Sequence, residues 1–216
     1  MSLSINIDYI RSSERAVVQN LQLEIPRGRI ATLMGASGSG KSSVLAVIAG
    51  TLSENLSAKA SILLNDKRLD SMPTYQRKVG LLFQDDLLFA HMTVAENLLF
   101  AIPAGDKQER NAKVKQALEE ADLNGFGSRD PATLSGGQRA RVALMRALLA
   151  NPEALLLDEP FSKLDFKLRA NFRNFVFSHI QKRQIPALLV THDSLDIAEP
   201  TLMVELSDLQ KNANAR

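Results

Sequence analysis

The chain has 216 residues, of which 45% are hydrophobic and 23% are charged, and its formal net charge is +2. This composition is typical of a globular protein with a buried core, and so small a net charge argues against nucleic acid or an anionic membrane surface as a partner. The sequence contains no cysteine, which excludes disulfides and thiolate metal sites. No apolar run approaches the roughly 20 residues that span a bilayer, and the N-terminal sequence MSLSINIDYI has no signal-peptide pattern. If the protein works at a membrane, we expect another chain to provide the membrane-spanning part.

The first eighty or so residues are predicted to form strands around a single helix. Alternation of polar and apolar residues predicts strands at Ser4–Tyr9 and around Leu21–Ile25. The continuous apolar run Ile30–Met34 is typical of a buried parallel strand, and a helix is expected at Ser43–Ala49, closed by Gly50. Further along, the pattern predicts a short strand at Ser61–Leu64, a turn at Asn65–Asp66 and a buried strand at Val79–Phe83.

The middle of the chain, from about residue 85 to about residue 134, is predicted to be mainly helical and inserted between strands. Thr93 and Glu96 have the spacing of a capping box for a helix at Val94–Ala101. Helical spacing also relates a later set of apolar residues that would face a core: Val114, Ala117, Leu118 and Ala121.

The last third alternates again between helices and strands. The predicted elements are a helix from Ala140 to Asn151, a buried strand at Ala154–Leu157, a helix at Lys167–Arg183 and a buried strand at Ala187–Thr191. The tail, residues 208–216, is expected to be frayed. Strands that alternate with helices indicate an α/β fold with a mostly parallel sheet, and we expect residues 1–216 to form one domain.

Residues Gly35–Ser42, with the sequence GASGSGKS, match the phosphate-loop pattern G-x-x-x-x-G-K-[ST] between a predicted strand and a predicted helix. Glycines let backbone N–H groups converge on phosphate oxygens, and the start of a helix adds its positive end. We expect Lys41 to reach the β- and γ-phosphates and the Ser42 hydroxyl to bind Mg²⁺. A flexible Gly/Ser turn is the alternative. The residues expected to surround the phosphates are Gly35, Ala36, Ser37, Gly38, Ser39, Gly40, Lys41, Ser42 and Ser43.

Two acidic residues, Asp158 and Glu159, follow the apolar run of a predicted strand. A buried parallel strand would deliver them to the same sheet edge as the phosphate loop. Asp158 would then hold Mg²⁺, and Glu159 would orient or polarise the attacking water. A solvated acidic turn is the alternative.

Two further polar residues follow buried strands. Gln84 could meet Mg²⁺ or the attacking water and link the nucleotide to the helical insertion, or it could simply begin a loop. His192 could contact the γ-phosphate, or it could be a surface histidine in a turn. We expect His179 to pack in the core, because it lies in an apolar stripe with Leu168, Phe172, Phe175, Val176 and Ile180. Nothing in the sequence around His91 indicates a function for it.

In the sequence LSGGQ, Gly136 and Gly137 follow Ser135, which is a good N-cap residue. They precede a strongly helix-forming run, Arg139–Leu149. Such a helix start favours an anion, yet no lysine follows the glycines as it would in a complete phosphate loop. The pattern therefore predicts half of a phosphate site.

Together these motifs resemble the ATP-binding cassette (ABC) ATPases, whose motifs occur in the same order from Gly35 to Asp193. GASGSGKS resembles the Walker A loop, LLLDEP the Walker B motif with the catalytic Glu159, and LSGGQ the signature. Gln84 resembles the Q-loop, Ser162–Asp165 the D-loop, and Thr191–Asp193 the H-loop. The resemblance implies a P-loop (RecA-like) core, an N-terminal antiparallel β subdomain and an inserted helical subdomain at about residues 85–134.

The resemblance also implies partners. Two copies would pack head to tail, and Ser135, Gly136, Gly137 and Gln138 would hold the γ-phosphate of an ATP whose other phosphates lie in the partner copy's loop. The helical insertion would receive an integral membrane permease, which places the protein in the cytoplasm, peripheral on the inner face of the cell membrane. The run Glu159–Asp165 resembles importer cassettes, which can work with a substrate-binding protein.

Two positions depart from the family pattern. An aromatic residue usually stacks on adenine, and Tyr9 is the nearest candidate; however, it shares a strand face with Ile5 and Ile7, so core packing is the alternative. Lys163 replaces the usual small D-loop residue, which could alter coupling between the two sites.

Other functions remain open, namely export, lipoprotein release or mechanical signalling through a membrane partner, and a non-transport role in DNA repair or translation.

Overall fold

The computed structural model describes residues 2–207, and the chain divides into two compact units. The first unit contains residues 2–81, 153–159 and 177–207 of the described chain, and the second contains residues 82–152 and 160–176. The tail that was expected to be frayed lies outside the described residues. No helix within residues 2–207 is long and apolar enough to cross a membrane.

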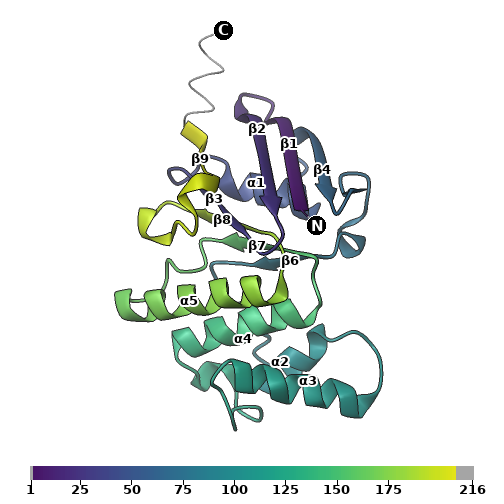
Figure 1. Ribbon diagram of the computed structural model, residues 1–216, viewed down its shortest axis with the longest axis vertical. Coiled ribbons are helices and arrows are strands. Elements are labelled where there is room, and N and C mark those ends of the chain that lie inside the picture. Colours follow the sequence, from purple (N-terminus) through teal and green to yellow (C-terminus); the bar gives the residue numbers. More distant parts are fainter. Residues whose placement is uncertain (1, 208–216) are drawn as a thin grey trace. The chain divides into compact units, whose positions relative to one another are not determined.

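The first unit contains an antiparallel sheet with the strand order β2-β1-β4-β5 (Figure 1). Its strands are β1 (Ser2–Arg11), β2 (Ala16–Pro26), β4 (Ser57–Leu64) and β5 (Lys67–Arg68). β1 pairs with both β2 and β4 and lies in the interior of the sheet. Asn65 and Asp66, with φ values of 52° and 64°, form the tight turn from β4 to β5, because a two-residue hairpin turn of this type needs positive φ at both residues.

A second sheet has the order β6-β7-β8-β3-β9. Its strands are β3 (Ile30–Met34), β6 (Val79–Leu82), β7 (Ala154–Asp158), β8 (Ala187–Thr191) and β9 (Met203–Glu205). The pairs β3–β8, β3–β9 and β7–β8 are parallel, and β8 is buried along its whole length. Helix α1 (Lys41–Ala49) contacts β1, β4 and β7, so strands of both sheets share one hydrophobic core with it.

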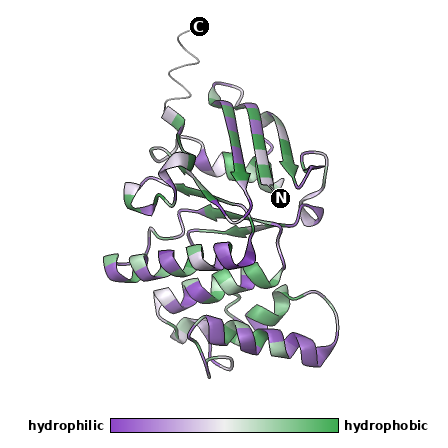
Figure 2. Cartoon of the chain, in the orientation of Figure 1, coloured by the Kyte–Doolittle hydropathy of each residue, from purple (hydrophilic) through white to green (hydrophobic). Residues whose placement is uncertain are grey.

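The second unit contains α2 (Val94–Ala101), α3 (Lys107–Glu120) and α4 (Gly136–Leu149), which pack against one another. Each helix begins at a capping side chain: Thr93 in a capping box with Glu96, then Asp106, then Ser135. α3 is largely hydrophilic (Figure 2), and the residues that it buries are Val114, Ala117 and Leu118. Helix α5 (Phe166–Arg183) belongs to the second unit up to Val176 and to the first unit from Phe177 onward.

The predicted fold class, α/β with a mostly parallel sheet, an antiparallel sheet and a helical insertion, is confirmed. Several boundaries differ from the predictions by one to a few residues, among them those of α4, β4 and β6. α4 begins at Gly136 rather than Ala140, because the Ser135 cap lets both glycines join its first turn. β4 begins at Ser57 rather than Ser61, and β6 ends at Leu82. The short strands β5 and β9 were not predicted; at two and three residues they are too short for a periodic pattern. Within residues 2–207, 3₁₀ turns η1 to η4 lie at Thr74–Gln76, Pro131–Thr133, Ser194–Asp196 and Pro200–Leu202.

Candidate functional site

The predicted phosphate loop connects β3, which ends at Met34, to α1, which begins at Lys41. Gly40 is the N-cap of α1, with φ 101° and no side-chain cap. A Cβ atom at Gly40 would lie 2.7 Å from Val17 Cγ1, so only glycine fits there without displacing β2. The first N–H groups of α1 have no partner within the helix, so the loop presents donors and a positive helix end to an anion.

Lys41 is the cation of this loop, and its side chain is only 5% exposed. Its Nζ donates to the carbonyl oxygens of Gly35, at 2.7 Å, and Ala36, at 3.0 Å, and lies 3.4 Å from Glu159 Oε1. The hydroxyl oxygen of Ser39 is buried without a hydrogen-bond partner. A buried hydroxyl without a partner is costly, and a phosphate oxygen in the loop would satisfy it. The residues therefore fit a bound triphosphate.

Asp158 ends β7 beside the phosphate loop, as the sequence predicted, and accepts a hydrogen bond of 3.2 Å from Ser42 Oγ. Burial raises the pKa of Asp158, and the charge of Glu159 raises it further, while Ser42 and Lys41 oppose this shift. No group of three or more potential His, Cys, Asp or Glu metal ligands occurs within residues 2–207. The Ser42 and Asp158 oxygens thus suit a hard cation that takes its other ligands from phosphate and water, as Mg²⁺ does.

Glu159, next in the chain, has a left-handed backbone with φ 45°. Its N–H donates to the carbonyl oxygen of Val190 on β8, at 3.0 Å. Its carboxylate lies between two groups, because Oε1 faces Lys41 and Oε2 lies 3.0 Å from His192 Nδ1. The Glu159 side chain is 19% exposed and that of His192 is 51% exposed, so both reach solvent. The sequence placed Glu159 and His192 at one sheet edge, but it gave no sign of their direct contact.

The remaining predicted site residues belong to the second unit. Ser135 caps α4 in a capping box: Gln138 N–H donates to Ser135 Oγ at 3.3 Å, and Ser135 N–H donates to Gln138 Oε1 at 2.9 Å. Gly136 and Gly137 form the first turn of α4, beside the side chains of Leu164 and Leu168 respectively. The second unit therefore carries a helix start suited to an anion, without a lysine in the motif.

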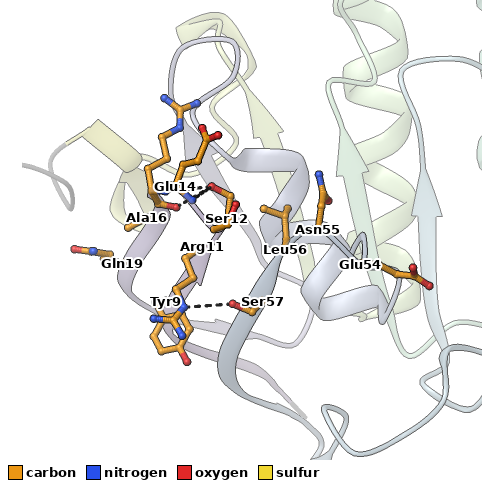
Figure 3. A pocket seen from close by; sticks show the side chains of 12 residues that line it. Tyr9, Arg11, Ser12, Glu14, Ala16, Gln19, Glu54, Asn55, Leu56 and Ser57 are labelled. Atoms are coloured by element: carbon orange, nitrogen blue, oxygen red, sulfur yellow. Dashed lines mark hydrogen bonds between the residues drawn. The ribbon is translucent and has the colours of Figure 1, made fainter.

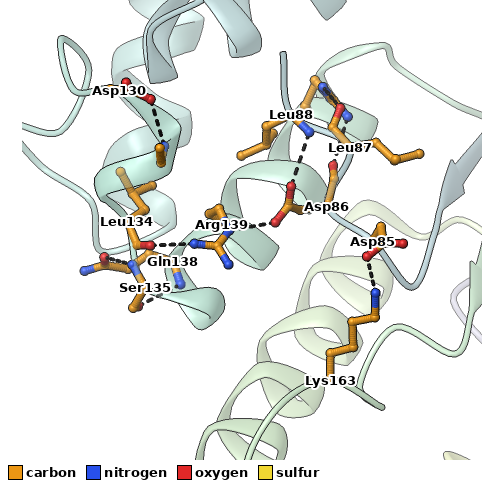
Figure 4. A network of polar contacts seen from close by, with 12 residues as sticks. Asp85, Asp86, Leu87, Leu88, Asp130, Leu134, Ser135, Gln138, Arg139 and Lys163 are labelled. Carbon is orange, nitrogen blue, oxygen red and sulfur yellow. Dashed lines mark hydrogen bonds and ion pairs between the residues drawn. The ribbon is translucent and has the colours of Figure 1, made fainter. Parts of the chain in front are cut away.

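Gln84 is exposed and lies two residues beyond the end of β6. The two acids that follow it are each paired with a cation, Asp85 with Lys163 and Asp86 with Arg139 (Figure 4). These ion pairs were not predicted. The only signal for them is two consecutive acids after a strand, which does not reveal a partner distant in sequence.

Tyr9 does not occupy the core position that one interpretation gave it. The pairing of β1 with β4 shifts register between Ile7 and Tyr9, so that Ile10 is fully buried and Tyr9 only half-buried. A β-bulge of this kind changes the face on which later side chains lie. Tyr9 lines a hollow of about 660 Å³, where Arg11 lies over its ring at 4.8 Å from the centroid (Figure 3).

Another hollow, of about 370 Å³, adjoins the phosphate loop and is lined by residues 15–19 and 36–39. Arg15, Ala16 and Gln19 line both hollows, whereas Tyr9 lines only the first. Nothing in this arrangement favours Tyr9 as the adenine-stacking residue.

His179 is 6% exposed, which confirms that it packs in the interior. Phe172, Val176 and Ile180 from the same predicted stripe are also buried. Leu168, expected in that stripe, is instead 40% exposed, and it lies beside Gly137 at the start of α4.

A phosphate loop at the end of the buried strand β3, an acid pair at the end of β7 in the same sheet and a capped Gly-Gly helix start define the class of nucleotide-binding proteins to which this chain belongs. The sequence model described as ABC transporter matches residues 18–162, and the chain is a member of that family. It is 48% identical over 207 residues to the uncharacterized ABC transporter ATP-binding protein YnjD of Escherichia coli strain K12, an alignment that covers 95% of each chain. The protein is therefore an ABC transporter ATP-binding subunit and an ABC-type ATPase.

Proposed function

We propose that the protein hydrolyses MgATP at a site whose reactive groups come from the first unit. Lys41 and the loop from Gly35 to Ser43 bind the phosphates, and Ser42 with Asp158 holds Mg²⁺. The convergence of Lys41, Ser42, Asp158, Glu159 and His192 through the contacts described above supports this assignment. Mg²⁺ supplies a Lewis acid that neutralises charge developing on the transferred phosphoryl group.

Glu159 is the residue proposed to activate water. Its carboxylate is held from two sides, by Lys41 and His192, which fixes its direction better than a solvated acidic turn would. His192 is proposed to contact the γ-phosphate and to orient Glu159, and Gln84 to act as a further contact for Mg²⁺ or water.

The second unit is proposed to complete the site of another copy. Ser135, Gly136, Gly137 and Gln138 form a capped helix start without a lysine in the motif, so this half-site is assigned to the γ-phosphate of an ATP bound to a partner molecule. In a two-fold dimer each copy then provides both halves. ATP at 100 times its dissociation constant would favour such a dimer by roughly 2.7 kcal/mol per site.

The membrane partner is proposed to be a separate permease that docks on the helical insertion, at about residues 85–134. Exposed apolar side chains in the second unit support a protein contact there: Phe83 at 45%, Leu87 at 54% and Phe100 at 64% exposure. The protein would then lie in the cytoplasm, peripheral on the inner face of the cell membrane. Import is favoured over export by the run Glu159–Asp165, with a substrate-binding protein as a further partner.

The Glu159→Gln variant tests this proposal. Binding of MgATP survives while water activation fails, so the variant is expected to form a stable dimer with MgATP and to hydrolyse ATP at least about 100-fold more slowly than the wild type. Size-exclusion chromatography with and without MgATP measures the first effect, and phosphate release measures the second. Glu153→Gln, at the opposite end of β7, is the matched control and should behave as the wild type. A Glu159→Gln variant that stays monomeric and turns over normally contradicts the proposal.

A further inference from the structure

The segment after β6 is held by cations from two separate parts of the second unit. Asp85 pairs with Lys163, which lies between β7 and α5. Asp86 Oδ2 accepts a hydrogen bond of 2.8 Å from Arg139 Nε, on the first turns of α4. Figure 4 shows both pairs, with Arg139 and Lys163 reaching the two acids from different directions. Gln84 immediately precedes these two acids, so its position depends on both contacts.

The same segments line a hollow of about 130 Å³. Its lining includes Gln84, Asp85, Arg139 and Lys163, together with apolar side chains such as Phe172. Protein interiors usually fix the spacing of neighbouring segments by close packing. Where a hollow separates them, side-chain contacts across it decide the spacing instead. The Lys163–Asp85 pair is such a contact.

The segment that carries Lys163 also adjoins the start of α4. A Cβ atom at Gly136 would lie 3.9 Å from Leu164 Cδ2, and Arg139 donates to the carbonyl oxygen of Leu134 at 2.7 Å. The residues after Leu82, the Gly-Gly helix start and the segment Ser162–Asp165 are thus linked by a short set of contacts. Lys163 provides the link to the residues beside Gln84.

We propose that Lys163 is a positioning residue, which sets the place of Gln84 through its ion pair with Asp85. Without the lysine, the adjacent carboxylates of Asp85 and Asp86 repel each other. The segment is then held by cations of α4 alone, Arg139 on the Asp86 carboxylate and Arg146 on the carbonyl oxygens of Asp86 and Leu87. The Lys163 and Asp85 side chains are 54% and 64% exposed, and exposed pairs add little to global stability. The pair therefore affects local geometry more than folding. This inference rests on the proposed ATPase function, because Gln84 has its proposed role there.

Three variants test the pair: Lys163→Met, Asp85→Asn, and the charge swap in which Lys163→Asp is combined with Asp85→Lys. Each single variant is expected to lower kcat for MgATP hydrolysis about fivefold, the upper range for an exposed ion pair, with KM nearly unchanged. The charge swap should restore most of the rate, since it restores the pair with reversed polarity. Lys59→Met is the matched control, because Lys59 forms a comparable exposed pair with Asp8, at 3.0 Å, on the antiparallel sheet. It should leave the rate unchanged.

A double-mutant cycle distinguishes positioning from a general structural effect. If Lys163 acts through Gln84, then Lys163→Met should have no further effect in a Gln84→Ala background, whereas independent effects would multiply. Equal rates for wild type and Lys163→Met, no recovery in the charge swap, or multiplicative effects with Gln84→Ala would each overturn the proposal. A wild-type protein that hydrolyses no MgATP would overturn the proposed function itself, an outcome visible before any Lys163 variant is compared.

Discussion

The Lys41 ammonium group and the Glu159 carboxylate lie 3.4 Å apart, although one begins a helix and the other follows a strand far along the chain. The contact joins the phosphate loop to the acid that follows β7, and the second carboxylate oxygen of Glu159 faces His192. The cation of the loop and the proposed base are therefore positioned by each other before any nucleotide arrives.

Lys41→Ala should weaken nucleotide binding. The lysine is 5% exposed and donates to two loop carbonyls, so its ammonium group already lies within the phosphate loop. Loss of one charged hydrogen-bond donor predicts about 30-fold weaker binding of ATP. Titration calorimetry with ATP measures this, with Lys59→Ala as the control. Unchanged affinity would remove Lys41 from its assigned role.

Asp158→Asn should raise the Mg²⁺ requirement of hydrolysis. Asp158 accepts a hydrogen bond from the Ser42 hydroxyl, and burial raises its pKa above the usual value, so a cation bound beside it would favour the charged form. Removing that charge should raise the half-saturating Mg²⁺ concentration about tenfold. A Mg²⁺ titration of phosphate release, with Asp8→Asn as the control, measures the shift. If both variants match the wild type, Asp158 is not a metal ligand.

Two substitutions at Ser135 should separate its structural role from its binding role. Ser135→Ala removes the capping box of α4 and should lower the free energy of unfolding by about 1 kcal/mol. Ser135→Asp keeps a good N-cap and should preserve stability, but its charge would repel a γ-phosphate and abolish the ATP-dependent dimer. Denaturant unfolding and size-exclusion chromatography give the two readouts. An Ser135→Asp variant that still dimerises with MgATP would argue against the half-site.

Glu199→Gln should lower stability in a pH-dependent way. Arg29 bonds to Glu199 and the Ile30 N–H donates to its Oε1 at 3.1 Å; the Arg29 bond is the larger cause of a lowered Glu199 pKa, and burial opposes it. Because the folded-state pKa lies below the unfolded value, the stabilisation is complete above pH ~4.5 and is lost as the pH falls through the folded-state pKa.

The expected decrease in melting temperature for Glu199→Gln is about 2 °C at pH 7. It should shrink toward zero in acid below the unfolded-state pKa. Thermal unfolding of wild type and variant across this range measures it. A difference that grows as the pH falls would have the wrong sign for this ion pair.

The sequence predicted those parts of the fold that depend on local pattern. Continuous apolar runs located β3 and β8 with the correct bounds, and the Thr93–Glu96 spacing located α2 and its cap. The position of Asp158 beside the phosphate loop was predicted because parallel strands end at one edge, although its hydrogen bond with Ser42 was not. The sheet face on which the Tyr9 side chain lies could not be predicted, because the bulge in β1 arises from its pairing with β4.

The pairs Lys163–Asp85 and Arg139–Asp86 depend on how separate segments meet in three dimensions. No periodicity within one segment encodes them. For the same reason, the sequence showed where the reactive groups of the first unit lie along the chain but not which of them touch.

The left-handed backbone of Glu159 lies at the position to which the proposed mechanism assigns water activation. A carboxylate-bearing residue at φ 45° is held against its own conformational preference, and a glycine there would relieve that strain. Glu159→Gly should therefore relieve backbone strain but leave the buried Lys41 without its carboxylate partner, and the variant should no longer hydrolyse ATP. The proposed chemistry would thus require a residue whose backbone is strained at this position.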